Sequence, residues 1–137
     1  MRRKLRATGR GQSVVEFALV APLFFFMLFG VLEGGRMIYA YNTINHAAQE
    51  AAREGILVTT TNVSQIRTRA VDAASPLEVR PGDVTVQVNG GAKNYGDREI
   101  GDRLRVTVNY RFTPVVMMLF GSSAPFQLSA TTEMMIE

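Results

Sequence analysis

Residues 11–36 read GQSVVEFALVAPLFFFMLFGVLEGGR, and this stretch decides the fold. It contains a nineteen-residue run, Val14 to Leu32, in which Glu16 is the only charged residue. At ~1.5 Å per residue, a helix of that length is about 28 Å long, close to the ~30 Å hydrocarbon thickness of a bilayer. The sequence therefore predicts a membrane-spanning helix.

Charge is distributed unevenly on the two sides of this helix. The first eleven residues contain no acid and five bases, namely Arg2, Arg3, Lys4, Arg6 and Arg10. Because basic residues collect on the cytoplasmic side, we expect the N-terminus inside and the chain after residue 33 outside. Residues 12–137 carry ten bases and twelve acids, so the net charge of +3 does not indicate a nucleic-acid partner. The chain has no cysteine, which excludes disulfides, thiolate nucleophiles and Cys-ligated metals.

Three kinds of membrane segment compete for the apolar run. A cleaved secretory signal has a shorter apolar core, of roughly 7–15 residues, and no Ala-x-Ala site follows Leu32. The pair Arg2-Arg3 alone is weak evidence for a twin-arginine signal. A plain anchor fits everything except Glu16, whose carboxylate is costly in a membrane unless it is paired or reaches the headgroups.

The surroundings of Glu16 favour a paired role. Gly11 ends the basic leader, four residues follow, and then come Glu16 and Phe17. This pattern resembles a prepilin peptidase site, and the wider run to Gly55 resembles TadE-like proteins of the tight-adherence (Tad, type IVc) pilus. The densest matches are QSVVEFALVAP and EGGR.

The resemblance implies a role for each matching residue. Gly11 would be the last residue of the leader that the peptidase removes, and Gln12 would become the new N-terminus. Glu16 would attract the free α-ammonium of a neighbouring subunit during assembly. An amine and a carboxylate that both enter apolar surroundings neutralise each other, whereas an unpaired one is penalised. Further along the helix, Pro22 is expected to kink or loosen it, and Gly30 and Gly34 to allow another helix to approach.

The resemblance also implies partners and a location. The partners are the prepilin peptidase, other pilin subunits and the pilus assembly platform. The chain would be a single-pass protein of the inner membrane that enters the extracellular pilus after assembly, serving adhesion and biofilm formation. A Tad major pilin is usually a much shorter chain, which favours a minor pilin or pseudopilin. The expected parts are a leader (1–11), a transmembrane and assembly helix (12–35) and an extracytoplasmic domain (36–137).

The helix is expected to continue beyond the membrane over residues 36–54. An apolar stripe at helical spacing supports this continuation, made of Met37, Tyr41, Ile44, Ala48 and Ala51. It is rich in alanine, so we expect close packing against it, and Gly55 is a plausible terminator. Residues 59–62 read as a loop with a helix cap, and 63–74 as a second helix.

Alternating apolar and polar residues predict three strands, at 84–89, 103–112 and 126–136. Three half-buried strands form a small antiparallel sheet whose apolar face needs a cover. The alanine-rich stripe is the natural one. We therefore expect an α+β, pilin-like fold: a long N-terminal helix, a short second helix, and a three-stranded sheet packed on the outer half of the long helix.

Two segments stay open at this stage. The apolar block 114–121 is too short to span a membrane, and it fits the core, the membrane surface or a subunit contact. The loop 90–102 contains Asp97, Glu99 and Asp102, but it lacks the spacing of a known calcium loop and favours a solvated hairpin.

No enzyme motif is found. The single histidine, His46, has no Cys partner, and phosphate-loop, dinucleotide and zinc-protease patterns are missing. We therefore expect neither catalysis nor a cofactor nor a bound metal. The remaining alternative to a processed subunit is an uncleaved single-pass anchor that binds another extracytoplasmic partner.

Overall fold

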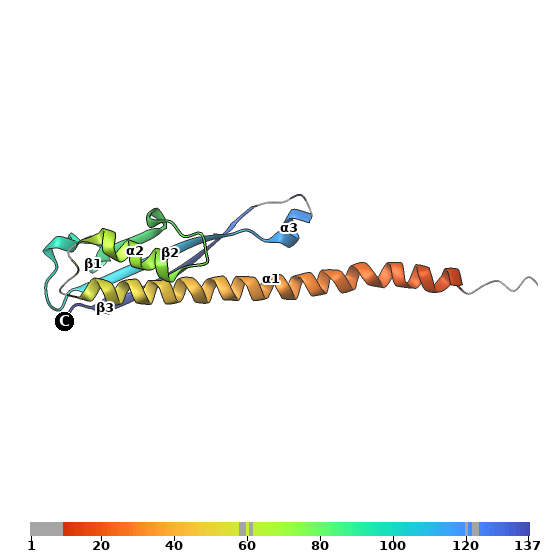
Figure 1. Cartoon of the computed structure of the whole chain (residues 1–137), viewed down its shortest axis with the longest axis horizontal. Helices are drawn as coiled ribbons and strands as arrows, with labels where there is room; N and C mark the ends of the chain where they lie inside the picture. The colour runs from red at the N-terminus through yellow and green to blue at the C-terminus, as the bar shows by residue number, and fades with distance from the viewer. Residues whose placement is uncertain (1–9, 58–59, 61, 120, 122–123) are drawn as a thin grey trace, which may run out of the picture.

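One helix dominates the computed structural model, which describes residues 10–57, 60, 62–119, 121 and 124–137. Helix α1 (Arg10–Ile56) has 47 residues and is about 70 Å long at ~1.5 Å per residue. Figure 1 shows it as a rod that carries the rest of the chain beside its C-terminal half. The predicted segments 12–35 and 36–54 are thus parts of one helix, whereas residues 1–9 of the predicted leader lie outside the described residues.

Helix α2 (Val63–Ala73) begins at the cap that the sequence predicts. The Asn62 side chain accepts a hydrogen bond from the Gln65 backbone N–H at 3.2 Å, and the Gln65 side chain accepts one from the Asn62 N–H at 3.4 Å. This reciprocal capping box satisfies two N–H groups that the first turn leaves without a partner. Thr59 and Thr61 of the predicted loop lie outside the described residues.

The three strands form one antiparallel sheet in the order β1-β2-β3, which confirms the α+β fold. They are β1 (Val84–Val88), β2 (Arg103–Phe112) and β3 (Phe126–Met135), and β1 and β3 end one residue earlier than predicted. The register places Arg105 opposite Glu133, and their side chains form an ion pair of 2.8 Å on the polar face. The neighbouring pair of hydroxyls, Thr107 and Thr131, lies 2.9 Å apart on the same face.

The apolar face of the sheet is covered by α1 and α2. Alanines of α1 make close packing possible, and Ala47, Ala48, Ala51 and Ala52 are all fully buried. The lower part of the predicted stripe is different, because Met37 and Tyr41 are 41% and 44% exposed. The first fully covered residue of α1 is instead Ala40, at 2% exposure. The sheet therefore covers α1 only from about this level.

Gly55 does not terminate α1 but lies one residue inside its end. A Cβ at Gly55 would lie 2.3 Å from Leu104 Cδ2 and 3.0 Å from Ile66 Cδ1. Both of these neighbours are fully buried. The glycine is thus required by close packing of α1 on β2 and α2.

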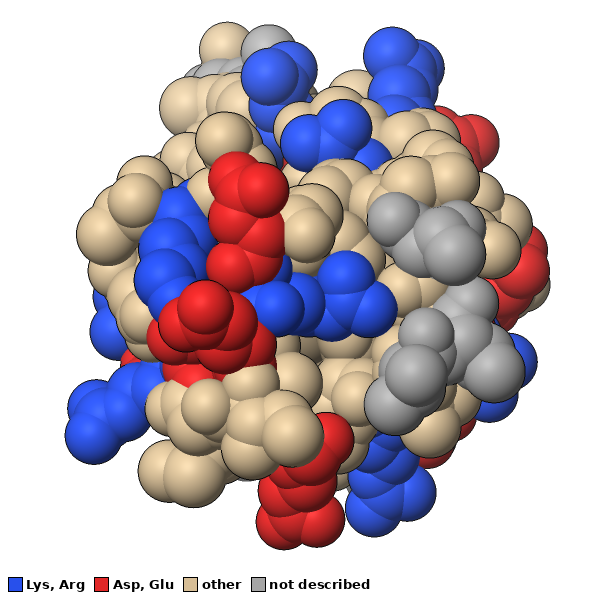
Figure 2. Space-filling view, turned by 90° about the vertical axis from the view of Figure 1, so that its left-hand side faces the viewer, with Lys and Arg blue, Asp and Glu red and all other residues tan. Residues whose placement is uncertain are grey.

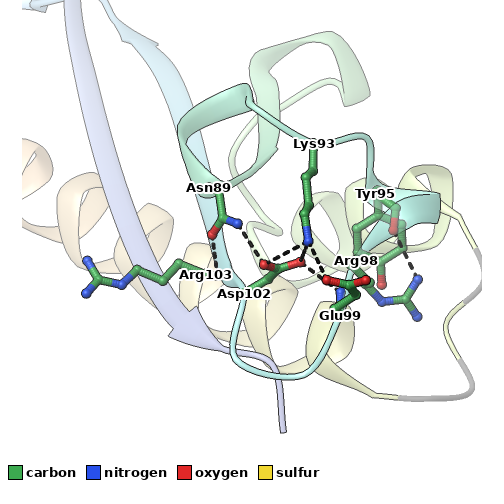
Figure 3. A network of polar contacts seen from close by, with 7 residues as sticks. All are labelled: Asn89, Lys93, Tyr95, Arg98, Glu99, Asp102 and Arg103. Carbon is green, nitrogen blue, oxygen red and sulfur yellow. Dashed lines mark hydrogen bonds and ion pairs between the residues drawn. The ribbon is translucent and has the colours of Figure 1, made fainter.

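The loop 89–102, whose polar side chains are shown in Figure 3, is attached to the C-terminal end of α1 through Tyr95. It contains two short 3-10 turns, η2 (Asn89–Gly91) and η3 (Tyr95–Asp97); a third, η1 (Pro81–Asp83), precedes β1. The Tyr95 hydroxyl is buried and donates to the Gly55 carbonyl at 2.7 Å. Arg98 donates to the Thr60 carbonyl at 2.7 Å, and its guanidinium stacks 4.2 Å from the Tyr95 ring centroid.

Asp102 organises the same loop from within. Its carboxylate accepts hydrogen bonds from the Glu99 backbone N–H at 2.8 Å, from Lys93 Nζ at 3.0 Å and from Asn89 Nδ2 at 2.7 Å. The Glu99 N–H, followed by Lys93 and Asn89, holds the pKa of Asp102 below its usual value. Lys93 also bonds Glu99, at 2.8 Å, so its ammonium bridges two of the three loop acids considered for calcium. The loop is therefore the largely exposed hairpin that was expected, and hydrogen bonds to Asp102 hold its shape.

Candidate functional site

The predicted processing residues begin helix α1. Gly11 and Gln12 lie in its first turn, and both are exposed. A Cβ at Gly11 would meet nothing within 4 Å. The first N–H groups of a helix have no acceptor within the helix, so this turn opens more easily than the middle. The bond between Gly11 and Gln12 therefore lies at the exposed start of α1.

Glu16 and Gln12 are in direct contact. The Gln12 side-chain amide donates a hydrogen bond of 2.9 Å to Glu16 Oε1, across one helical turn. Glu16 itself is exposed, like the apolar residues on either side of it. Gln12, which is predicted to become the N-terminus, thus forms a hydrogen bond with the carboxylate of Glu16, which is predicted to bind an amine. The sequence analysis missed this contact, although side chains four apart on a helix are neighbours.

Among the described residues, nothing buries the most apolar part of α1. No residue in the most apolar stretch of α1 is buried, and the helix is long and apolar enough to cross a membrane. Phe17, Leu19 and Leu23 are all more than 70% exposed. An apolar surface of this extent marks a membrane or protein contact in a folded protein.

Pro22, Gly30 and Gly34, which were expected to kink the helix or to let another helix approach, lie in the same apolar part of α1. Helix α1 continues through Pro22 without a break, although proline cannot donate to the carbonyl one turn before it. Gly30 and Gly34 line a shallow apolar groove together with Pro114 and Met117 from the β2–β3 connection. A Cβ at either glycine would meet nothing within 4 Å, so no contact among the described residues requires a glycine there.

The apolar block 114–121 contains the short helix α3 (Val115–Leu119), which lies beside the middle of α1 (Figure 1). It is attached by Glu33, whose Oε2 accepts the Val115 and Val116 backbone N–H groups at 2.9 and 3.3 Å. Glu33 Oε1 bonds Arg36 at 2.9 Å. The sequence gives no indication of this contact, because 82 residues separate Glu33 from Val115. Phe120 of the block lies outside the described residues.

These features define an α+β protein with one N-terminal helix suited to a membrane. Residues 11–53 match the sequence model of the family described as TadE-like protein, which confirms the resemblance over nearly all of α1. Over these residues the N-terminal helix is similar to that of TadE-like proteins, and this similarity suggests an association with Tad pilus systems as a minor pilin-like protein. No curated protein and no solved structure matches the chain.

Proposed function

We propose that this chain is a membrane-inserted prepilin-type subunit that is processed after Gly11 and acts as a minor pilin or pseudopilin of a Tad pilus. The observation that carries the proposal is Glu16. It is the one charge between residues 14 and 32, it lies five residues after Gly11, and it belongs to a TadE-like helix with an uncovered apolar surface.

The contact with Gln12 gives Glu16 two successive partners. Before processing, the Gln12 amide satisfies the carboxylate within the same chain. Cleavage creates an α-ammonium at Gln12, and the ammonium of a neighbouring subunit then replaces the amide. The amide is neutral, whereas the ammonium brings a positive charge to the carboxylate, and low dielectric strengthens the attraction between the two opposite charges. Pairing therefore becomes favourable only between processed subunits, which sets the register of adjacent helices.

The remaining parts of the proposal follow from this role. Prepilin peptidase cuts at the cytoplasmic face, the inner membrane stores the subunit, and the assembly platform transfers it to a pilus for adhesion and biofilm formation. The chain acts as a structural subunit and catalyses no reaction. The competing function is an uncleaved membrane anchor that presents the sheet domain to another partner.

Replacement of Gly11 by leucine tests processing. In cells that contain the peptidase, we expect the native chain to begin at Gln12 and Gly11→Leu to keep its leader completely, because a branched side chain obstructs the cleavage site. The mass of the intact chain measures both. Gly35→Leu, at an exposed glycine of the same helix with open space around it, is the matched control and should be processed normally. A native chain that retains Met1 would support the anchor instead.

Replacement of Glu16 tests the pairing. Glu16→Val and Glu16→Gln should both be cleaved and inserted, and both should lower incorporation into pili, because neither carries the charge that attracts the ammonium. Immunoblots of sheared pili against the membrane fraction give the ratio. If Glu16→Gln enters pili at the native level, the carboxylate is not the pairing group.

A further inference from the structure

We propose that helix α3 is a second membrane contact, with Val115, Met117 and Met118 inserted into the lipid interface beside the spanning helix. This inference rests on the proposed insertion of α1, but it does not depend on which end of α1 faces the cytoplasm. The occupant of the α3 surface is lipid.

The first argument is position along α1. Glu33 directly follows the nineteen-residue apolar run, so a bilayer that encloses the run ends at about this residue. The two hydrogen bonds from Val115 and Val116 to Glu33 attach α3 at that level. A groove between the elements is lined by Phe29 and Leu32 of α1 on one side and by Val115 and Val116 on the other. The connection thus reaches back to side chains of the span itself.

The second argument is the surface that α3 exposes. Val115, Met117 and Met118 are 52%, 38% and 57% exposed, and the neighbouring Phe126 is 49% exposed. Interfacial segments bury their apolar side chains about 5–10 Å into the headgroup and acyl boundary. The four steps from Phe29 to Glu33 cover about 6 Å along the axis of α1, which is a matching depth.

The third argument is charge. No Asp, Glu, Lys or Arg occurs between Arg111 and Glu133, so the whole β2–β3 connection is uncharged. The opposite end of the molecule differs, because Figure 2 shows basic and acidic side chains side by side over that end. Arg36 lies one turn beyond Glu33, with its guanidinium 5.4 Å from the Phe112 ring centroid, at the level expected for headgroups. The uncharged end of the sheet domain is therefore the end that faces the bilayer.

Fluorescence quenching by lipid tests the contact. The chain has no tryptophan, so Met118→Trp introduces a single reporter at an exposed site. The full chain is reconstituted into phosphatidylcholine and phosphatidylglycerol vesicles whose acyl chains are brominated near the headgroups or near their ends. Ile100→Trp, at a residue 85% exposed in the loop at the far end of the sheet domain, carries the same intrinsic preference of tryptophan for interfaces. Phe24→Trp reports the middle of the span.

We expect the Met118→Trp emission to shift to the blue and to be quenched most by shallow bromines, whereas Ile100→Trp is quenched only by aqueous iodide. Val115→Trp should behave like Met118→Trp and gives a second reading if one variant folds poorly. If Phe24→Trp is quenched by deep bromines and both α3 reporters are not, the inference is wrong and the proposed function stands. If Phe24→Trp is not quenched either, the span and the inference both fail. Protection of the α3 reporters from lipid and from iodide would indicate a protein contact, such as a second copy, and would also overturn the inference.

Discussion

At the scale of single residues, Gly55 is a position where the packing of α1 leaves no room for a side chain. Gly55→Ala would place a methyl group against the buried tips of Leu104 and Ile66. Overpacking of a core costs about 1–3 kcal/mol, and the better helix propensity of alanine returns about 0.5–1 kcal/mol. We expect a net loss of roughly 1 kcal/mol in the free energy of unfolding. Urea unfolding of the full chain in detergent micelles, followed by near-UV circular dichroism, measures it.

Gly35→Ala is the control for this prediction, because it makes the same change in the same helix with nothing within 4 Å. It should leave the stability unchanged or raise it slightly. Equal effects of the two substitutions would mean that helix propensity, and not contact with the sheet, decides the result. The sequence pointed to Gly55 only as a helix terminator, because its neighbours Leu104 and Ile66 are distant along the chain.

At the scale of elements, the loop 89–102 makes the fold sensitive to acid through Asp102. The Glu99 N–H, Lys93 and Asn89 lower the pKa of Asp102 in the folded chain. A carboxyl group with a lowered pKa contributes stability above its unfolded pKa, about 3.9, and loses that contribution as the pH falls through the folded pKa. We expect Asp102→Asn to be less stable than the native chain at pH 7, with a difference that shrinks below about pH 4.

Unfolding midpoints in urea across this pH range measure that difference. The matched control is Asp72→Asn, which makes the same change at an exposed residue of α2 and should be about as stable as the native chain at pH 7. A difference between native and Asp102→Asn chains that stays constant into acid would show that the geometry of the loop matters, and not the ionised carboxylate.

The elements themselves were largely predictable from the sequence, because their patterns are local. The alternation along 103–112 and the cap at Asn62 need only near neighbours, and both were predicted correctly. Helix α3 was not, since five residues are too few for a helical period to be recognised. Its place is determined by Glu33, a residue of another element. The contact of Gln12 with Glu16 could have been predicted from the sequence, because residues four apart on a helix lie one turn from each other.

At the scale of the whole molecule, the two parts of helix α1 lie in different surroundings. The N-terminal part of α1 exposes large apolar side chains, whereas the C-terminal part presents buried alanines to the sheet. The sequence showed a continuous apolar run in the first part and an apolar stripe in the second, but not where one surrounding gives way to the other. That level depends on where the sheet ends, which is why Met37 and Tyr41 were wrongly expected to be covered.

This division predicts opposite responses to one kind of substitution. Ala48→Leu enlarges a fully buried contact between α1 and the sheet, so the free energy of unfolding of the domain should fall by about 1–3 kcal/mol. Ala18→Leu makes the same change at an exposed residue of the apolar segment, where lipid accommodates it, and should leave that unfolding unchanged. Urea unfolding in micelles measures the domain, and resistance to alkaline extraction from membranes should persist in both variants. A loss of domain stability in Ala18→Leu equal to that in Ala48→Leu would contradict the division, because it would mean that the apolar half of α1 packs against the sheet domain and not against lipid.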